Sequence, residues 1–198
     1  MKTIPVNWVD VNKIQDGTDS ALCWAAACAN ALTYTGWNSR DPFDLYDDIK
    51  RVKENKGNGL FRGLVFCFCL LGIKICYSEY TRILPTSFLN ACGNLEEKNA
   101  CLLLSIAADG LKSGHALTAY RSVFDKTRSQ DDIRSLKQFL CVDSDDSDIV
   151  NRFTERTFLL NMAYDIEKKR METDYKLNGN KTYIRYAVLL LPEQNPLF

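Results

Sequence analysis

The chain has 198 residues, of which 46% are hydrophobic and 25% charged, and its 25 basic residues balance its 25 acidic ones. These values are typical of an ordinary globular protein with a sizeable core, so we expect one domain spanning residues 1–198. Because the formal net charge is zero, no overall field attracts nucleic acid or an anionic membrane face, and we expect neither as a partner.

Segments that would indicate a membrane, a compartment or a metal site are weak. The N-terminal residues contain no apolar core of a secretory signal peptide, which leaves a secreted mature form and a cytoplasmic protein both open. The longest apolar run, residues 64–73, is about half the length of a bilayer-spanning helix and predicts a buried one. Eight cysteines without a Cys-x-x-Cys pair, beside one histidine, disfavour a structural zinc site and favour reduced thiols.

The first half of the chain, about residues 1–98, is predicted to be mainly helical. A helix-forming run over residues 21–32 can be capped by Asp19 or Ser20, and Gly36 ends it. Three further helices are expected to begin near Asp41-Pro42, after Gly59 and after Pro85.

The second half, about residues 99–198, is predicted to be mainly β. The strands are expected over residues 100–108, 115–124, 136–142, 158–162 and 183–191. The first is apolar throughout, as a central strand buried on both faces would be. A turn-like segment over 125–132 predicts a hairpin, and the polar residues 166–181 are expected to form a surface excursion. Helices first and strands second predict an α+β fold.

Cys23 is the candidate nucleophile, because the predicted helix places it in the first helical turn. Unpaired backbone N–H groups and the positive end of the helix dipole favour a thiolate at such a position. The alternative is that Cys23 is one more structural cysteine among the eight.

His115 is the candidate base, since a cysteine nucleophile needs a group that titrates near neutrality and the chain has no other histidine. It follows Gly114 and opens a predicted strand. We expect the glycine to allow a tight turn and the imidazole to lie at an exposed strand end facing a cleft. A cysteine at a helix start followed far downstream by a histidine is the order of papain-like enzymes. Taken alone, a single histidine is more often a structural or surface residue.

A third group should hold the imidazole in the correct tautomer. Residues 143–148 offer four carboxylates directly after the strand that follows the histidine strand, so an orienting role is sterically reasonable. A calcium loop fits poorly, because the central glycine is absent and Thr154 replaces glutamate at the twelfth position. A solvated surface loop is the alternative.

Three segments occur in a consistent order: residues 13–26 around Cys23, residues 115–120 at the histidine and residues 142–145, Val-Asp-Ser-Asp. They resemble the nucleophile region, the histidine strand and the Asp-Ser-Asp motif of the streptococcal IgG-degrading endopeptidases, a family of the papain-like superfamily. Trp24 differs from the glycine of that family but matches the Cys-Trp pair of papain.

The resemblance implies a papain-like fold, in which an N-terminal helical half carrying the nucleophile packs on a C-terminal antiparallel sheet carrying the histidine and the acid. It implies a cysteine endopeptidase acting on a protein substrate, such as a host protein. By the same resemblance Lys13 lines the oxyanion hole, Asp143 orients the histidine and Asp145 supports the site. From the residues alone, which aspartate is the triad acid stays open.

The expected chemistry needs no metal and no organic cofactor. The Cys23 thiolate attacks a carbonyl carbon, and the Cys23 backbone N–H and the Lys13 ammonium receive the oxyanion. Gln15 is a rival donor, because papain uses a glutamine upstream of its cysteine. His115 then protonates the leaving amine and activates water.

Two other functions stay open. A deamidase, a transglutaminase or an isopeptidase would use the same triad on a different acceptor, and only the product distinguishes it. A non-catalytic interaction domain would have purely structural cysteines. The sequence indicates neither the substrate nor the oligomeric state.

Overall fold

The computed structural model describes residues 11, 22–51, 77–80, 85–93, 95–112, 114–144 and 157–192. In chain order its elements are α1 (Cys23–Tyr34), α2 (Pro42–Arg51), β1 (Tyr77–Tyr80), α4 (Pro85–Cys92), β2 (Cys101–Ala108), β3 (His115–Phe124), the 3-10 helix η2 (Ile133–Ser135), β4 (Leu136–Val142), β5 (Phe158–Asp165), β6 (Arg170–Leu177) and β7 (Asn180–Leu190). The α+β class is confirmed. The helix expected after Gly59 and the apolar run 64–73 lie outside the described residues.

Helix α1 begins later than its sequence predicts. Its N-cap is Leu22, which makes no side-chain capping hydrogen bond. The amides of Ala25 and Ala26 donate to the Leu22 carbonyl oxygen at 2.9 and 3.2 Å, and these are the first helical hydrogen bonds. The predicted start near Asp19 is therefore wrong, but Cys23 still lies in the first turn, as predicted, because it is the first residue of the helix.

The turn between the first two helices follows the sequence prediction. Helix α1 ends at Tyr34, and Gly36 adopts a φ of +85°, which a side chain rarely tolerates. Helix α2 begins at Pro42, as predicted, and the Asp41 carboxylate caps it by accepting a hydrogen bond from the Phe43 amide at 2.8 Å.

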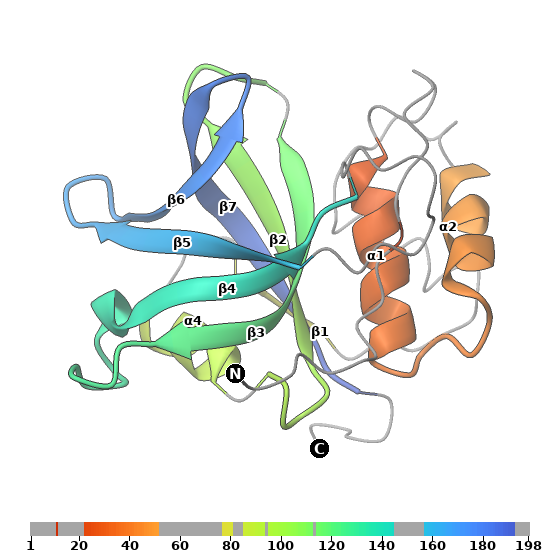
Figure 1. The fold of residues 1–198 in the computed structure, drawn as a ribbon, viewed down its shortest axis with the longest axis horizontal. Coiled ribbons are helices and arrows are strands. Elements are labelled where there is room, and N and C mark those ends of the chain that lie inside the picture. The colour runs from red at the N-terminus through yellow and green to blue at the C-terminus, as the bar shows by residue number, and fades with distance from the viewer. Residues whose placement is uncertain are drawn as a thin grey trace.

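All strand pairs are antiparallel, in the order β1-β7-β2-β3-β4-β5-β6, and β6 also pairs with β7. One edge of β7 pairs with β2; along the other edge, Asn180–Tyr183 pairs with β6 and residues 187–190 pair with β1. Strands β2 to β7 therefore close on themselves (Figure 1). The predicted hairpin of β3 and β4 is confirmed.

Two strands were not expected. Strand β1 lies in the half predicted to be helical, and β6 lies within residues 166–181, which were expected to form a surface excursion. The polar composition of β6 concealed it. Met171 and Thr173 are buried while the residues between and beyond them are more exposed, and backbone pairing with β5 and β7 holds the strand in place.

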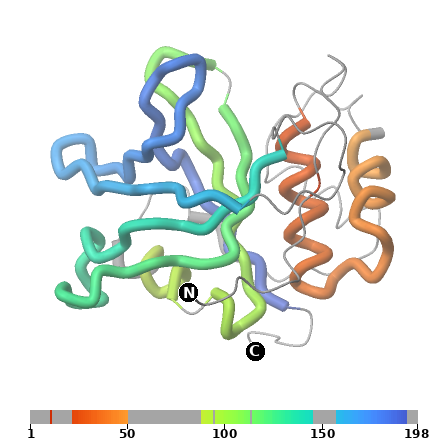
Figure 2. Tube along the Cα trace, viewed as in Figure 1, coloured from red at the N-terminus to blue at the C-terminus, as the bar shows by residue number. Residues whose placement is uncertain are grey.

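The core lies on both faces of β2, whose residues are almost all buried, as predicted for a central strand. On one face Cys101 and Leu103 pack with α1 and α2. On the other face Leu102 and Leu104 pack with α4 and with residues of β4 to β7. Figure 2 shows α1 and α2 together on one side of the closed sheet.

Three contacts fix α1 and its neighbouring loop against the strands. The Thr118 hydroxyl of β3 donates to the Ala27 carbonyl oxygen at 3.4 Å, and the Tyr34 and Tyr120 rings lie 4.5 Å apart. The Trp37 indole donates to the Leu191 carbonyl oxygen at 2.7 Å, just beyond β7. This packing carries the first residue of α1 toward the first residue of β3. No helix among the described residues is long and apolar enough to span a bilayer.

Candidate active site

Three elements bring the predicted nucleophile, base and acid together. His115 is the first residue of β3, and Asp143 directly follows the last residue of β4. Because β3 and β4 are antiparallel neighbours with Thr118 opposite Val142, the first residues of β3 lie beside the last residues of β4. Cys23 begins α1, which packs across β3.

The imidazole of His115 is bonded to the carboxylate of Asp143. The Nε2 atom lies 2.6 Å from Oδ1, and the two side chains are 5% and 16% exposed. A carboxylate on one ring nitrogen favours the tautomer with the proton on that nitrogen. The other nitrogen, Nδ1, is then the one that faces away from the carboxylate and can exchange a proton.

Cys23 lies close enough to His115 for its thiol group to raise the pKa of the imidazole through hydrogen bonding and charge. Because Nε2 is engaged by Asp143, Nδ1 is the nitrogen that remains for the thiol. Cys23 is partly exposed, whereas the other described cysteines are buried. The three residues predicted from the sequence are thus brought together, with the imidazole bonded to the carboxylate and influenced by the nearby thiol group.

The imidazole is held in its charged form over a wide pH range. Burial lowers the pKa of His115, but the hydrogen bonds with Asp143 and Cys23, together with the negative charges of these two groups, outweigh burial and raise the pKa to about 10. At neutral pH an imidazolium therefore lies between a thiol group and a carboxylate. Such an arrangement has a proton ready for a leaving group.

The other described cysteines have different surroundings. Cys28, Cys92, Cys101 and Cys141 are buried in the core. Burial raises the pKa of the Cys92, Cys101 and Cys141 thiols above the ordinary value, which keeps them protonated. Of the described cysteines, Cys23 is the one that combines exposure with an imidazole partner.

The expectation of an exposed histidine at a strand end is wrong. His115 is only 6% exposed, because Cys23 at the start of α1 and the ring of Tyr175 lie against it. The role expected of Gly114 also changes, since it does not adopt a positive φ. A Cβ atom at this position would lie 2.5 Å from the Ile106 carbonyl oxygen, so a glycine is needed for the close approach of β2 and β3.

We therefore expect Gly114→Ala to destabilise the protein by about 2 kcal/mol, because the added methyl group overpacks against backbone that cannot move cheaply. The backbone must shift to make room for the methyl group, which should also displace the adjacent His115 and slow any reaction that depends on this histidine. Gly93→Ala is the matched control, since its Cβ would meet its nearest atoms at an ordinary 3.5 Å. Urea unfolding measures the difference; equal stability of the two variants would contradict the close-approach argument.

Tyr175 of β6 belongs to the site, and sequence reasoning missed it. Its hydroxyl donates to Asp143 Oδ2 at 2.7 Å. Its ring is stacked on the imidazole of His115, with centroids 5.5 Å apart and planes inclined by 10°. No sequence pattern pointed to it, because it is one tyrosine of nine within a segment whose polar composition predicted a surface excursion.

Lys13, Gln15 and Asp145 lie outside the described residues, so the expected oxyanion donors and the second acid are not placed. Val11, shortly before Lys13, is described. Its amide donates to the Asn30 side chain of α1 at 2.7 Å, and both residues are buried.

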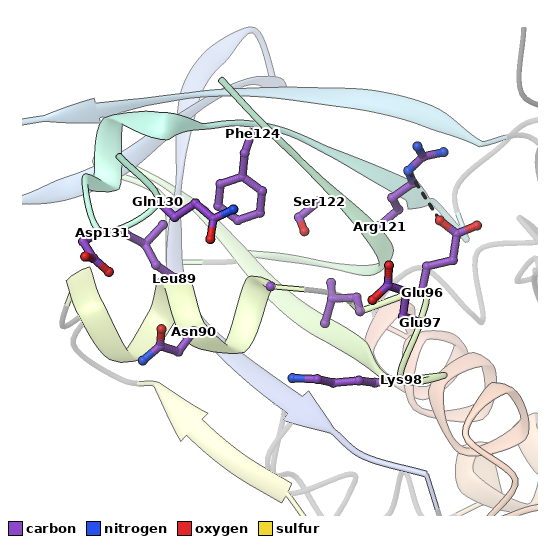
Figure 3. Close-up of a pocket in the computed structure, with 12 residues that line it drawn as sticks. Leu89, Asn90, Glu96, Glu97, Lys98, Arg121, Ser122, Phe124, Gln130 and Asp131 are labelled. Atoms are coloured by element: carbon purple, nitrogen blue, oxygen red, sulfur yellow. Dashed lines mark ion pairs between the residues drawn. The ribbon is translucent and has the colours of Figure 1, made fainter. Parts of the chain in front are cut away.

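A cavity of about 450 Å³ lies apart from this site, between α4 and the far end of β3 (Figure 3). Arg121 and Glu96 form an ion pair at 3.5 Å in the wall of the cavity, and Phe124 also lines the cavity. None of the residues that line the cavity belongs to the thiol, imidazole and carboxylate cluster. Among the described residues, no group of histidine, cysteine and acidic side chains is arranged to hold a metal ion.

Comparison of the sequence with models of known protein families, and with curated proteins, finds no match.

Proposed function

We propose that this chain is a cysteine endopeptidase of the papain-like type, with Cys23 as nucleophile, His115 as general acid and base, and Asp143 as the orienting acid. One observation carries the proposal: the chain's only histidine has a partly exposed thiol group beside it and a carboxylate bonded to its Nε2 atom. A nucleophile, a base and an orienting group in series are the pattern of triad-based acyl transfer.

The arrangement of elements gives the same proposal a structural basis. A helix that starts with the nucleophile packs on an antiparallel sheet, and the sheet carries the histidine at the start of one strand and the acid at the end of its neighbour. We propose that this is the papain-like arrangement of a helical half and a β half, about residues 1–98 and 99–198.

In the proposed reaction the Cys23 thiolate attacks the carbonyl carbon of a peptide bond. The first amides of α1 have no intrahelical partner, so the Cys23 N–H can receive the developing oxyanion, and such a donor is worth about 3 kcal/mol. The His115 imidazolium gives its Nδ1 proton to the leaving amine, which leaves an acyl group on Cys23. The neutral imidazole then takes a proton from water, and the hydroxide formed attacks the acyl carbon, which releases the carboxylic acid and restores the Cys23 thiolate beside the imidazolium. Lys13 is the proposed second oxyanion donor.

We expect iodoacetamide at mildly acidic pH, about 5.5, to alkylate Cys23 well before the buried cysteines, because a thiol paired with an imidazolium reacts as a thiolate. Peptide mapping by mass spectrometry identifies the labelled residue. His115→Gln should slow labelling of Cys23 markedly, whereas Cys92, Cys101 and Cys141 serve as slow internal controls. Uniformly slow labelling would instead support a non-catalytic domain.

A further inference from the structure

Tyr175 contacts two members of the proposed triad at once. Its hydroxyl is bonded to the Asp143 oxygen that does not face His115, so both carboxylate oxygens are held by hydrogen bonds. Its ring lies nearly parallel to the imidazole, and the Phe158 ring packs against Tyr175 with centroids 6.1 Å apart. A carboxylate held at both oxygens cannot rotate without breaking a hydrogen bond.

An irregularity in the pairing of β6 with β7 places the Tyr175 side chain beside His115. Thr173 pairs with Thr182 and Lys176 pairs with Lys181, so two residues of β6, one of them Tyr175, have no opposite residue in β7. Such a bulge redirects side chains that a regular strand would place elsewhere, and bulges are frequent beside active sites. The position of Tyr175 over the imidazole thus depends on the bulge.

Two buried hydroxyl groups hold the bulge in place. Thr182 Oγ1 donates to the Tyr175 carbonyl oxygen at 2.9 Å and lies 2.5 Å from Thr173 Oγ1. Because the single hydroxyl proton of Thr182 goes to the carbonyl, Thr173 is the donor of the second bond. Both threonines are less than 10% exposed, so these bonds are shielded from competition by water.

We propose that Tyr175 is a positioning residue of the Cys23–His115–Asp143 site: its hydroxyl fixes the carboxylate against Nε2, and its ring excludes water from one face of the imidazole. This inference rests on the proposed function for its catalytic meaning. The effect of Tyr175 on the hydrogen bond between His115 and Asp143, however, does not depend on catalysis. Without the hydroxyl the carboxylate turns and hydrates, which weakens the bond that favours the imidazolium. Without the ring, water screens the remaining attraction.

The 198-residue chain has one histidine, so NMR titration of this chain reports on His115 without overlap. We expect the wild-type midpoint near pH 10. Tyr175→Phe, which keeps the ring and removes the hydroxyl, should lower the midpoint by at least about half a pH unit. Tyr175→Leu removes both contacts and should lower it further. Where hydrolysis is measured, the alkaline limb of its pH profile should move with the NMR midpoint.

Tyr164→Phe, in β5, is the matched control, because the same hydroxyl is removed from a partly buried tyrosine of a neighbouring strand and the titration should not move. An unchanged or raised midpoint in folded Tyr175→Phe overturns the inference while leaving the proposed function intact. Loss of the proposed function is distinguishable, since it would show as slow Cys23 labelling although Tyr175 still controls the titration of His115.

Discussion

Replacement of Cys23 by alanine is expected to reduce peptide hydrolysis by about 10⁴-fold or more, because the acyl intermediate of the proposed reaction forms on its sulfur. His115→Ala should cost about as much, since the thiol then loses the group with which it shares a proton. The double variant should be little worse than either single one, because residues that act as a unit have strongly non-additive effects. Cleavage of a mixed peptide library, followed by mass spectrometry, measures all three.

The matched control is Cys28→Ala, which removes a thiol from the same helix at a fully buried position. It should retain turnover within a few-fold of the wild type, apart from a modest loss of stability. Retained turnover in folded Cys23→Ala or His115→Ala would contradict the proposed mechanism. A mass gain of about one unit on an intact partner protein, in place of cut chains, would indicate a deamidase with the same triad.

Much of the fold could be predicted because its signals are local. The alanine-rich run of α1, Pro42 after Asp41, and the apolar run of β2 each define an element from a few neighbouring residues. Strand β6 could not be predicted, since its residues are polar and its place in the sheet is set by pairing with β5 and β7. Closure of the sheet depends on the same long-range pairing.

In the candidate site, too, the residues with local sequence signals could be predicted, whereas those placed by long-range pairing could not. Cys23, His115 and Asp143 could be proposed from residue type, order and adjacency to predicted elements, without their distances. Tyr175 could not, because its contact with Asp143 depends on a bulge in a strand that the sequence conceals. The burial of His115 was also missed, since the covering groups come from α1 and β6, which are far from it in sequence.

Asp143→Ala is expected to lower hydrolysis at neutral pH by about 10³ to 10⁴-fold, because the imidazole loses the group that fixes its tautomer and its orientation. Asp131→Asn, in the turn between β3 and β4, removes one negative charge from an exposed position and should leave turnover unchanged. Asp145→Ala should have a smaller effect than Asp143→Ala, if Asp143 is the triad acid. The opposite order would assign that role to Asp145.

Asp143→Ala should also change the pH dependence of hydrolysis, which provides a second, independent test. The imidazolium that protonates the leaving amine is present below the pKa of His115 and is lost as the pH rises through about 10, so wild-type activity should fall there. In Asp143→Ala, burial still lowers the pKa of His115 while one of the two groups that raise it is gone. The alkaline limb should therefore move to lower pH, which kcat/KM measured from pH 6 to 11 would detect. An alkaline limb that stays near pH 10 in this variant would show that Asp143 does not control the charge of His115.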